Sequence, residues 1–333
     1  MTDPSRVRPA RLGVDLISMI LVAAGLVLLV AGGDLLVRGA VAVARRLRVS
    51  PLLIGLTLVG FGTSTPELVT SLQAAYLGAP GIAIGNVVGS NIANILLILG
   101  VAALLSPMVI DRKAFGRDGS VLVVSSLMCL GAVLSGRLQP LMGAVFVMAL
   151  AAYVAVSFLQ DRARTAADAR YDQPGPAPDG AAASLSLNIL FLLLGLAMTI
   201  GGARLLVVGA IDIAEAFGIS ETVIGLTIVA VGTSLPELVT SVAAAIRKQS
   251  DLAFGNVIGS NIYNVLFILG ATAMVKPLPV PEQIVRLDIW VMLFASALLV
   301  VMAMTAWRIS RLEGALLLAS YIAYSAWLAV LAS

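Results

Sequence analysis

The sequence predicts an all-α polytopic membrane protein, with ten transmembrane helices arranged as two inverted-topology five-helix repeats. Hydrophobic residues make up 60% of the 333 residues and charged residues only 12%, whereas a soluble domain is roughly one-quarter charged. Residues 50–100 recur as residues 220–270, at an offset of 170, with 30 identities in 51 ungapped positions. Apolar segments of bilayer-spanning length occupy most of the chain. Together these features predict a duplicated membrane protein.

The apolar segments divide the chain into a first repeat (1–159), a linker (160–184) and a second repeat (185–333). The linker contains three prolines and mixed charges, which is typical of a flexible connection. Each half holds an odd number of spans, so the second half must enter the membrane from the opposite side. In transporters of that design the binding site lies near the midplane, between interrupted helices. The expected spans are residues 15–44, 50–77, 80–105, 119–136, 140–159, 185–212, 219–246, 251–275, 287–307 and 312–331.

The first apolar segment belongs to the repeating unit. Arg6, Arg8 and Arg11 precede it, a pattern that also occurs in cleaved signal peptides. However, residues 32–40 align with residues 202–210 at the same offset of 170. We therefore expect the first helix to be retained in the mature protein.

The distribution of basic residues predicts the orientation. The connections that follow the odd-numbered spans hold 13 of the 21 Lys and Arg residues, and the opposite side holds six. By the positive-inside rule the linker is cytoplasmic and both termini lie outside the cell (inner) membrane, although the N-terminal arginines oppose this assignment. The net charge of +3 is small and predicts no nucleic-acid partner. No obligate protein partner is evident.

The composition excludes several kinds of chemistry. Histidine is absent and Cys129 is the only cysteine, which rules out Ser-His and Cys-His catalysis, histidine- or cysteine-based zinc sites and intrachain disulfides. We expect no enzymatic activity and no cofactor, and we interpret Cys129 as a small residue that faces lipid or packs inside the protein. The remaining carboxylate, hydroxyl, amide and carbonyl oxygens are ligands for hard cations.

The most informative motif occurs once in each repeat, as GTSTPE (62–67) and GTSLPE (232–237). Proline removes a backbone N–H and clashes with the preceding turn, and the glycine four residues before it loosens the same place. The helix should therefore break, and free carbonyls in a membrane are tolerated only where they line a cavity or meet an ion. An intramembrane carboxylate is costly and indicates an ion or substrate pathway. The oxygens around the two breaks belong to Thr63, Ser64, Glu67, Thr233, Ser234 and Glu237.

A second paired motif is GNVVGSNIANILLILG (85–100), which is repeated as GNVIGSNIYNVLFILG (255–270). Ser90 and Asn94 are four residues apart and share a helix face, as do Ser260 and Asn264. The other asparagines of the motif face elsewhere, and we expect them to bond across helices or to bridge loosened backbone. They are Asn86, Asn91, Asn256 and Asn261.

Three charged residues lie away from the ends of the first spans of the two repeats. Asp34 and Arg38 are four residues apart and are expected to pair along the helix surface. Arg204 occupies the position that matches Asp34, and the sequence indicates no partner for it. We expect all three to have a structural or interfacial role.

At these motifs the sequence resembles the calcium/cation antiporter superfamily, and specifically its prokaryotic sodium/calcium exchanger branch. The branch is marked by GTS-x-PE in both halves followed by GN-x-x-GSN, whereas the proton/calcium branch shows a GNxxE-type motif. The resemblance covers both repeats and, through the ten-span plan, essentially the whole chain. It implies transported Ca²⁺ and Na⁺ as substrates, with carbonyls near Gly60 and Ala230 also contributing. The cation ligands it implies are Thr63, Ser64, Glu67, Ser90, Asn94, Thr233, Ser234, Glu237, Ser260 and Asn264.

Electrostatics favours exchange. Two buried carboxylates cost several kcal/mol each unless they are compensated, and one Ca²⁺ or two Na⁺ would neutralise them. An empty site would carry two negative charges through the barrier between the two states of the transporter. Only the cation-loaded protein should therefore cross that barrier readily. The resemblance further implies that Na⁺ moving into the cell drives the extrusion of Ca²⁺. Some relatives carry an aspartate where this chain has Asn94 or Asn264. The alternatives are a cation/proton antiporter, an ion channel with a carboxylate selectivity ring and an intramembrane hydrolase.

Overall fold

The computed structural model describes residues 16–47, 49–171, 184–217 and 230–332. The N-terminal arginines, part of the linker and the start of the seventh expected span lie outside these residues. The first half contains α1 (Leu16–Leu47), α2 (Pro51–Ile54), the π-helix η2 (Gly55–Val59), α3 (Gly60–Thr63), α4 (Thr65–Tyr76), α5 (Pro80–Ala93), the π-helix η3 (Asn94–Leu99), α6 (Gly100–Leu105), β1 (Met108–Val109), α7 (Arg112–Leu134), β2 (Arg137–Leu138) and α8 (Pro140–Tyr171).

The second half follows the same order. It contains α9 (Leu185–Ala216), α11 (Ala230–Thr233), α12 (Leu235–Ile246), α13 (Ser250–Tyr263), the π-helix η5 (Asn264–Leu269), α14 (Gly270–Val275), β3 (Leu278–Pro279), the π-helix η6 (Ile284–Asp288), α15 (Ile289–Ala306), β4 (Arg308–Ile309) and α16 (Arg311–Ala332). α8 continues to Tyr171, beyond its expected end at residue 159, so the first part of the linker segment is helical.

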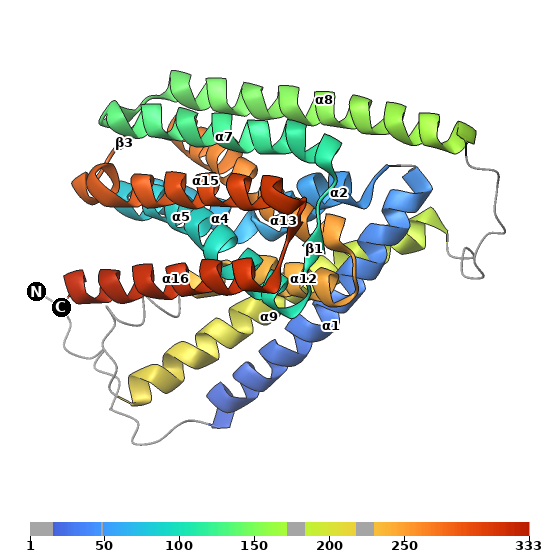
Figure 1. Ribbon diagram of the computed structural model, residues 1–333. Helices are drawn as coiled ribbons and strands as arrows, with labels where there is room; N and C mark the ends of the chain where they lie inside the picture. Colours follow the sequence, from blue (N-terminus) through green and yellow to red (C-terminus); the bar gives the residue numbers. More distant parts are fainter. Residues whose placement is uncertain (1–15, 48, 172–183, 218–229, 333) are drawn as a thin grey trace, which may run out of the picture.

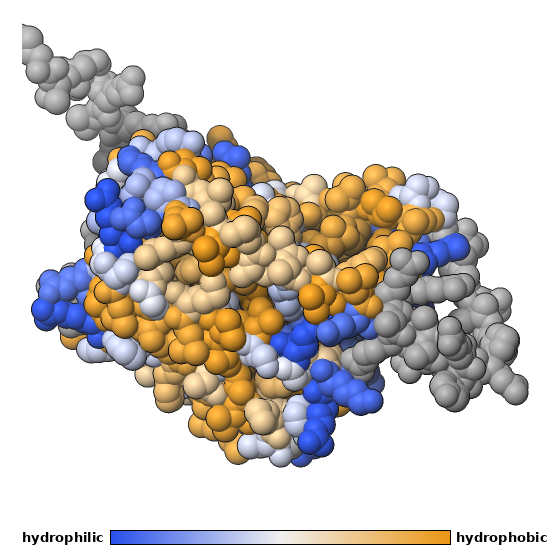
Figure 2. Space-filling model, turned by 90° about the horizontal axis from the view of Figure 1, so that it is seen from above, coloured by the Kyte–Doolittle hydropathy of each residue, from blue (hydrophilic) through white to orange (hydrophobic). Residues whose placement is uncertain are grey.

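The described helices are those of a polytopic membrane protein. Seven are long and apolar enough to cross a membrane, and the bent pair Leu52–Thr63 with Thr65–Tyr76 raises the number to eight. α12 is a shorter apolar helix, and α16 lies where the tenth span is expected. Figure 2 shows an apolar surface across the middle of one face, with hydrophilic residues gathered towards its ends. Such a surface suits a hydrocarbon environment.

Two short strand pairs join the halves. β1 pairs with β4 and β2 pairs with β3, both antiparallel. An offset of 170 residues carries β1 onto β3 and brings β2 close to β4, so the two pairs are equivalent under exchange of the repeats. Figure 1 places the β1 and β3 labels towards different ends of the helix bundle. These two-residue strands have no recognisable sequence pattern and were not expected.

α1 and α9 cross the other helices diagonally and pack against each other (Figure 1). Glycines make this contact close: a Cβ atom added at Gly195 would lie 2.4 Å from the backbone nitrogen of Leu36, and one added at Gly39 would lie 2.5 Å from that of Leu192. Small residues allow transmembrane helices to approach in this way. The expected Asp34–Arg38 ion pair is confirmed at 2.8 Å, and Arg247 of the second half also pairs with Asp34.

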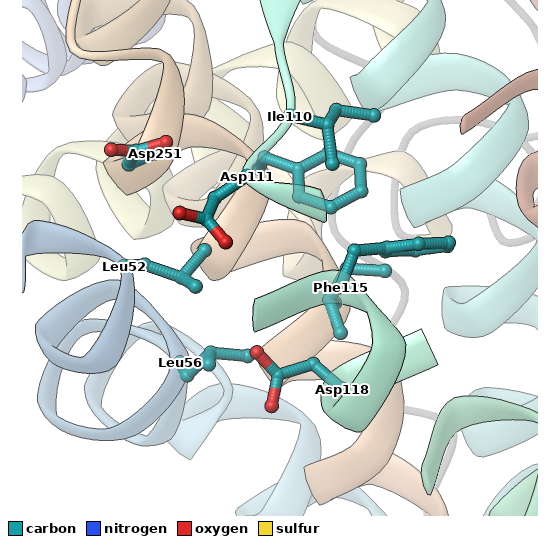
Figure 3. A pocket seen from close by; sticks show the side chains of 9 residues that line it. Leu52, Leu56, Ile110, Asp111, Phe115, Asp118 and Asp251 are labelled. Atoms are coloured by element: carbon teal, nitrogen blue, oxygen red, sulfur yellow. The ribbon is translucent and has the colours of Figure 1, made fainter. Parts of the chain in front are cut away.

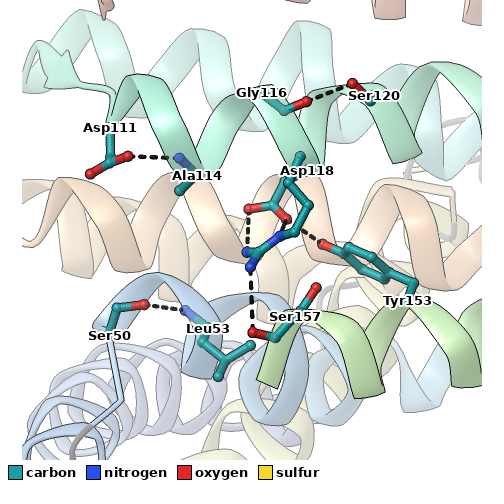
Figure 4. A network of polar contacts seen from close by, with 10 residues as sticks. Ser50, Leu53, Asp111, Ala114, Gly116, Asp118, Ser120, Tyr153 and Ser157 are labelled. Carbon is teal, nitrogen blue, oxygen red and sulfur yellow. Dashed lines mark hydrogen bonds and ion pairs between the residues drawn. The ribbon is translucent and has the colours of Figure 1, made fainter. Parts of the chain in front are cut away.

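A charged residue buried between α7 and α8 is compensated locally. Asp118 accepts hydrogen bonds from Arg117 and, at 3.0 Å, from the hydroxyl of Tyr153 (Figure 4). The second half holds a matching pair, in which the Tyr324 hydroxyl donates to Asp288 at 2.9 Å. Because these bonds satisfy the carboxylates, both aspartates have a structural explanation. The expected packing role of Cys129 agrees with its complete burial in α7.

Candidate functional site

The two helix breaks lie where the sequence predicts them. α3 ends at Thr63 and α4 begins at Thr65, with Ser64 between them at φ −82° and ψ 8°, and the helix axis bends by 43°. In the second half Ser234 has nearly the same conformation, at φ −90° and ψ 7°. Each proline lies in the first turn of the following helix, where its missing N–H has no helical partner to lose. The breaks are therefore built from local sequence.

Each break meets the glutamate of the other repeat. The Ser64 hydroxyl donates to Glu237 Oε1 at 2.9 Å, and the Ser234 hydroxyl donates to Glu67 Oε1 at 3.4 Å. Both glutamates are only 1% exposed. The two motifs, 170 residues apart in sequence, thus form one buried cluster with two carboxylates at its centre.

Two asparagines hold the backbone beside the glutamates. Asn86 Nδ2 donates to the Glu67 carbonyl at 3.0 Å and to Ser71 Oγ at 2.9 Å. Asn256 makes the equivalent bonds to the Glu237 carbonyl and to Ser241 Oγ, at 3.4 Å and 2.9 Å. The expectation that these asparagines bond across helices is confirmed. They fix the glutamate-bearing helices and leave the carboxylates to other partners.

The second motif surrounds this cluster. Both asparagines of the ligand set, Asn94 and Asn264, stand at the first residue of a π-helix, η3 or η5. η3 packs against α12, which carries Glu237, and η5 packs against α4, which carries Glu67. π-Helical turns inside α-helices occur frequently at functional sites. The position of each asparagine therefore also depends on the opposite repeat.

The serines of the second motif lie next to the opposite helix breaks. A Cβ atom added at Gly60 in α3 would lie 3.3 Å from the backbone nitrogen of Ser260. Ser90 is buried in α5, which packs against α11 of the second half. Asn264 Nδ2 donates to Asn91 Oδ1 at 3.0 Å, which links the two copies directly.

Five of the expected ligand residues have a buried oxygen without a hydrogen-bond partner. Buried polar atoms are normally satisfied, and an unmet one costs about 1–3 kcal/mol, more when it is charged. Both carboxylates and three neutral groups are among them, which is the donor chemistry that hard cations prefer. The atoms are Glu67 Oε2, Glu237 Oε2, Asn94 Oδ1, Ser260 Oγ and Asn264 Oδ1.

The motif threonines and the Gly60 carbonyl, which the resemblance also implies as ligands, differ from these atoms because they already have partners. The Thr63 hydroxyl donates to the Val59 carbonyl at 3.1 Å and to the Gly60 carbonyl at 3.3 Å. The Gly60 carbonyl also accepts from the Ser64 N–H at 3.1 Å, so it is engaged inside the helix. Thr233 is half-buried and already has an interaction partner. A cation here would compete with these local bonds.

A second acidic place is less suitable for a cation. Asp111, Asp118 and Asp251 line a small pocket with Leu52 and several other apolar side chains (Figure 3). Asp118 is already paired, and Asp111 accepts a hydrogen bond from the Ala114 N–H at 2.7 Å as the cap of α7 (Figure 4). Across the described ranges, no group of three or more His, Cys, Asp or Glu residues is arranged to hold a metal. The Glu67–Glu237 cluster is not such a group because it contains only two carboxylates. The other oxygens around it are neutral.

Two features of the site were not expected. One is the pair of serines, Ser71 and Ser241, that accept from the asparagines. Their signal was present, because each follows its glutamate by four residues, one helical turn, in both copies of the motif. The other is the series of π-helices, for which the sequence gives no clear signal.

The fold and this cluster define a class: a helical membrane protein that encloses paired carboxylates among neutral oxygen atoms. The profile of the sodium/calcium exchanger protein family matches residues 17–159 and 187–330. The chain therefore belongs to the sodium/calcium exchanger family.

Individual relatives agree with this membership. The putative antiporter CaxA of Alkalimonas amylolytica is 37% identical over 317 residues, covering 93% of this chain and 98% of CaxA. The sodium/calcium exchanger MaX1 of Methanosarcina acetivorans is 38% identical over 346 residues, covering 92% and 97%. A solved structure of the sodium-calcium exchanger NCX_Mj, soaked with 10 mM Na⁺ and zero Ca²⁺, has a TM-score of 0.80 and 35% identity, covering 93% and 98%. The chain is thus similar to antiporters along nearly its full length.

Proposed function

We propose that this protein is a Na⁺-coupled Ca²⁺ antiporter that binds cations between Glu67 and Glu237. The observation that carries the proposal is the reciprocal pairing of Ser64 with Glu237 and of Ser234 with Glu67, which leaves the second oxygen of each buried carboxylate without a partner. One Ca²⁺ balances the two negative charges, and so do two Na⁺. The relatives named as sodium/calcium exchangers support this choice of ions.

The architecture that we propose is ten spans in two inverted five-helix repeats, with residues 160–184 as the connection. The two strand pairs, which are equivalent when the repeats are interchanged, support this arrangement. So do the reciprocal serine–glutamate bonds, because a two-fold relation between the halves would produce both. In such transporters the halves rock around a fixed midplane site, which gives alternating access. The linker is then cytoplasmic and both termini are outside, by the distribution of arginines and lysines.

Charge neutralisation explains why such a protein exchanges ions. A loaded site is close to neutral and can pass through the low-dielectric occluded state, whereas an empty site would carry two uncompensated carboxylates at a cost of several kcal/mol. The transition between inward and outward states is therefore open mainly to cation-bound protein. Ser90, Asn94, Ser260, Asn264 and the two motif threonines provide the remaining oxygens.

Transport of ⁴⁵Ca²⁺ into proteoliposomes tests the proposal. We expect uptake when the vesicles are loaded with Na⁺ and diluted into Na⁺-free medium at clamped pH, and little uptake when Na⁺ is equal on both sides. Uptake that follows an imposed pH gradient and ignores Na⁺ would instead identify a cation/proton antiporter. Uptake without any ion on the opposite side would indicate a channel.

A further inference from the structure

An apolar groove of about 660 Å³ lies between α8 and the start of the first broken helix. Leu53 and Thr57 form part of one wall, and Ala151 and Phe158 of α8 form part of the other. Thr57 is the one polar side chain in the lining, and its hydroxyl donates to the Leu53 carbonyl at 2.6 Å. The groove therefore presents hydrocarbon and no free hydrogen-bonding group, which suits an apolar occupant.

The length of the groove matches one leaflet of a bilayer. Its α8 wall runs from Val147 to Phe158, which at 1.5 Å per residue is about 16 Å. One leaflet provides about half of the roughly 30 Å hydrocarbon thickness. Leu47, the last residue of α1, lines one end, and Phe267 of η5, close to the cation cluster, lines the other. The groove thus extends from a helix terminus to the depth of the site.

The end at Leu47 is basic. Arg45 and Arg46 occupy the last turn of α1 and are exposed. The acidic pocket with Asp111 and Asp251 lies on another face of α2, because Leu52 lines that pocket and Leu53 lines the groove. Basic residues next to a transmembrane helix attract anionic lipid headgroups.

We propose that this groove binds an acyl chain of an anionic glycerophospholipid, whose phosphate lies at Arg45 and Arg46. The inner end of such a chain would lie at Phe267, in the π-helix that begins at Asn264. Phe267 ends the groove and also lines a small pocket with Ser64 and Phe61, and the Phe61 and Phe267 ring centroids are 5.4 Å apart.

This aromatic contact is made at only one of the two helix breaks, the one that contains Ser64. The repeat positions of Phe61, Tyr263 and Phe267 hold Val231, Ala93 and Leu97. Tyr263 also contacts Phe61, with ring centroids 5.7 Å apart. A lipid in the groove therefore lies against an aromatic cover that only one of the two breaks has.

Lipid binding to the purified full-length protein tests the proposal without any transport measurement, so its failure is distinguishable from a failure of the antiporter assignment. Native mass spectrometry and thermal melting in neutral detergent would compare phosphatidylglycerol with phosphatidylcholine of the same acyl chains. We expect phosphatidylglycerol to form the one-lipid complex at about tenfold lower concentration, as two nearby arginines allow, and to raise the melting temperature.

Two neighbouring alanines of α8 give a matched pair of variants. Ala151 lines the groove, whereas Ala152 is exposed outside it. We expect Ala151→Phe to fill the groove and abolish both the lipid complex and the rise in melting temperature. Ala152→Phe should bind lipid as the wild type does. In Arg45→Gln/Arg46→Gln, the preference for phosphatidylglycerol over phosphatidylcholine should disappear while acyl binding remains.

Undiminished binding by a folded Ala151→Phe protein would overturn the location. Equal affinity of the wild type for the two lipids would overturn the anionic headgroup. If Ala151→Phe does not fold, Ala155→Phe, another exposed position in the groove lining, takes its place with the same expectations.

Discussion

At the scale of single residues, each carboxylate of the cluster depends on a group from the other repeat. Glu67 and Glu237 are buried, and one oxygen of each is engaged by a serine while the other has no partner. Hydrogen bonds to charged groups are worth about 1.5–3 kcal/mol. The serines therefore orient the carboxylates, and in the proposed function a cation binds the remaining oxygens.

Neutralising either glutamate should abolish exchange. We expect Glu67→Gln and Glu237→Gln to fold and to lose Na⁺-dependent ⁴⁵Ca²⁺ uptake, because one carboxylate cannot balance a divalent ion. The control is Glu282→Gln, whose side chain is 74% exposed in an ion pair with Arg286 and should leave uptake unchanged. Normal uptake by either cluster variant would refute the assignment of the site.

Removing a serine hydroxyl should weaken binding without abolishing transport. We expect Ser64→Ala to raise the Ca²⁺ concentration for half-maximal uptake roughly tenfold, since a hydrogen bond to a charged group is lost. Ser234→Ala should have a smaller effect, because its bond is 3.4 Å long and that of Ser64 is 2.9 Å. Ser120→Ala is the control, as its exposed hydroxyl bonds only within its own helix. Identical curves for Ser64→Ala and Ser120→Ala would contradict the reciprocal pairing.

At the scale of helices and strands, part of the structure follows from local sequence. The helix breaks were predictable because proline, glycine and an intramembrane glutamate each act on the nearest turn. Asn86 and Asn256 were expected to bond across helices because a buried amide group needs a hydrogen-bond partner. The identity of that partner was not predictable, since Ser71 and Ser241 become close only after the helices pack. The π-helices and the two-residue strands depend on tertiary contacts and leave no periodic pattern.

The contact between α1 and α9 should be intolerant of even one methyl group. We expect Gly195→Ala to destabilise the protein by about 1–3 kcal/mol, because its Cβ atom would lie 2.4 Å from the Leu36 nitrogen. Gly201→Ala in the same helix is the control: its Cβ atom meets nothing within 4 Å, and alanine favours a helix. Thermal melting of the two purified variants in detergent measures the difference. Equal melting temperatures would mean that the two helices are not packed so closely.

At the scale of the whole molecule, the inverted arrangement that we propose would place equivalent loops on opposite sides of the membrane. In a Cys129→Ala background, which should transport normally, a membrane-impermeant thiol reagent should label Ala79→Cys from outside and Gln249→Cys from the cytoplasm. These residues lie in the two turns that follow the broken helices. Labelling of both from one side would refute the inversion.

The exchanged strand pairs also bear on how the chain is made. β1 is synthesised early, but its partner β4 lies only one helix from the end of the described chain. Glu67 likewise accepts a hydrogen bond from Ser234, which is synthesised much later. A nascent chain of which only the first half has been made therefore has β1 and Glu67 without the second-half groups that they contact in the folded protein. The β1–β4 pair and the Glu67–Glu237 cluster therefore cannot be completed before the second half has been synthesised, and the first half must persist in the bilayer until then.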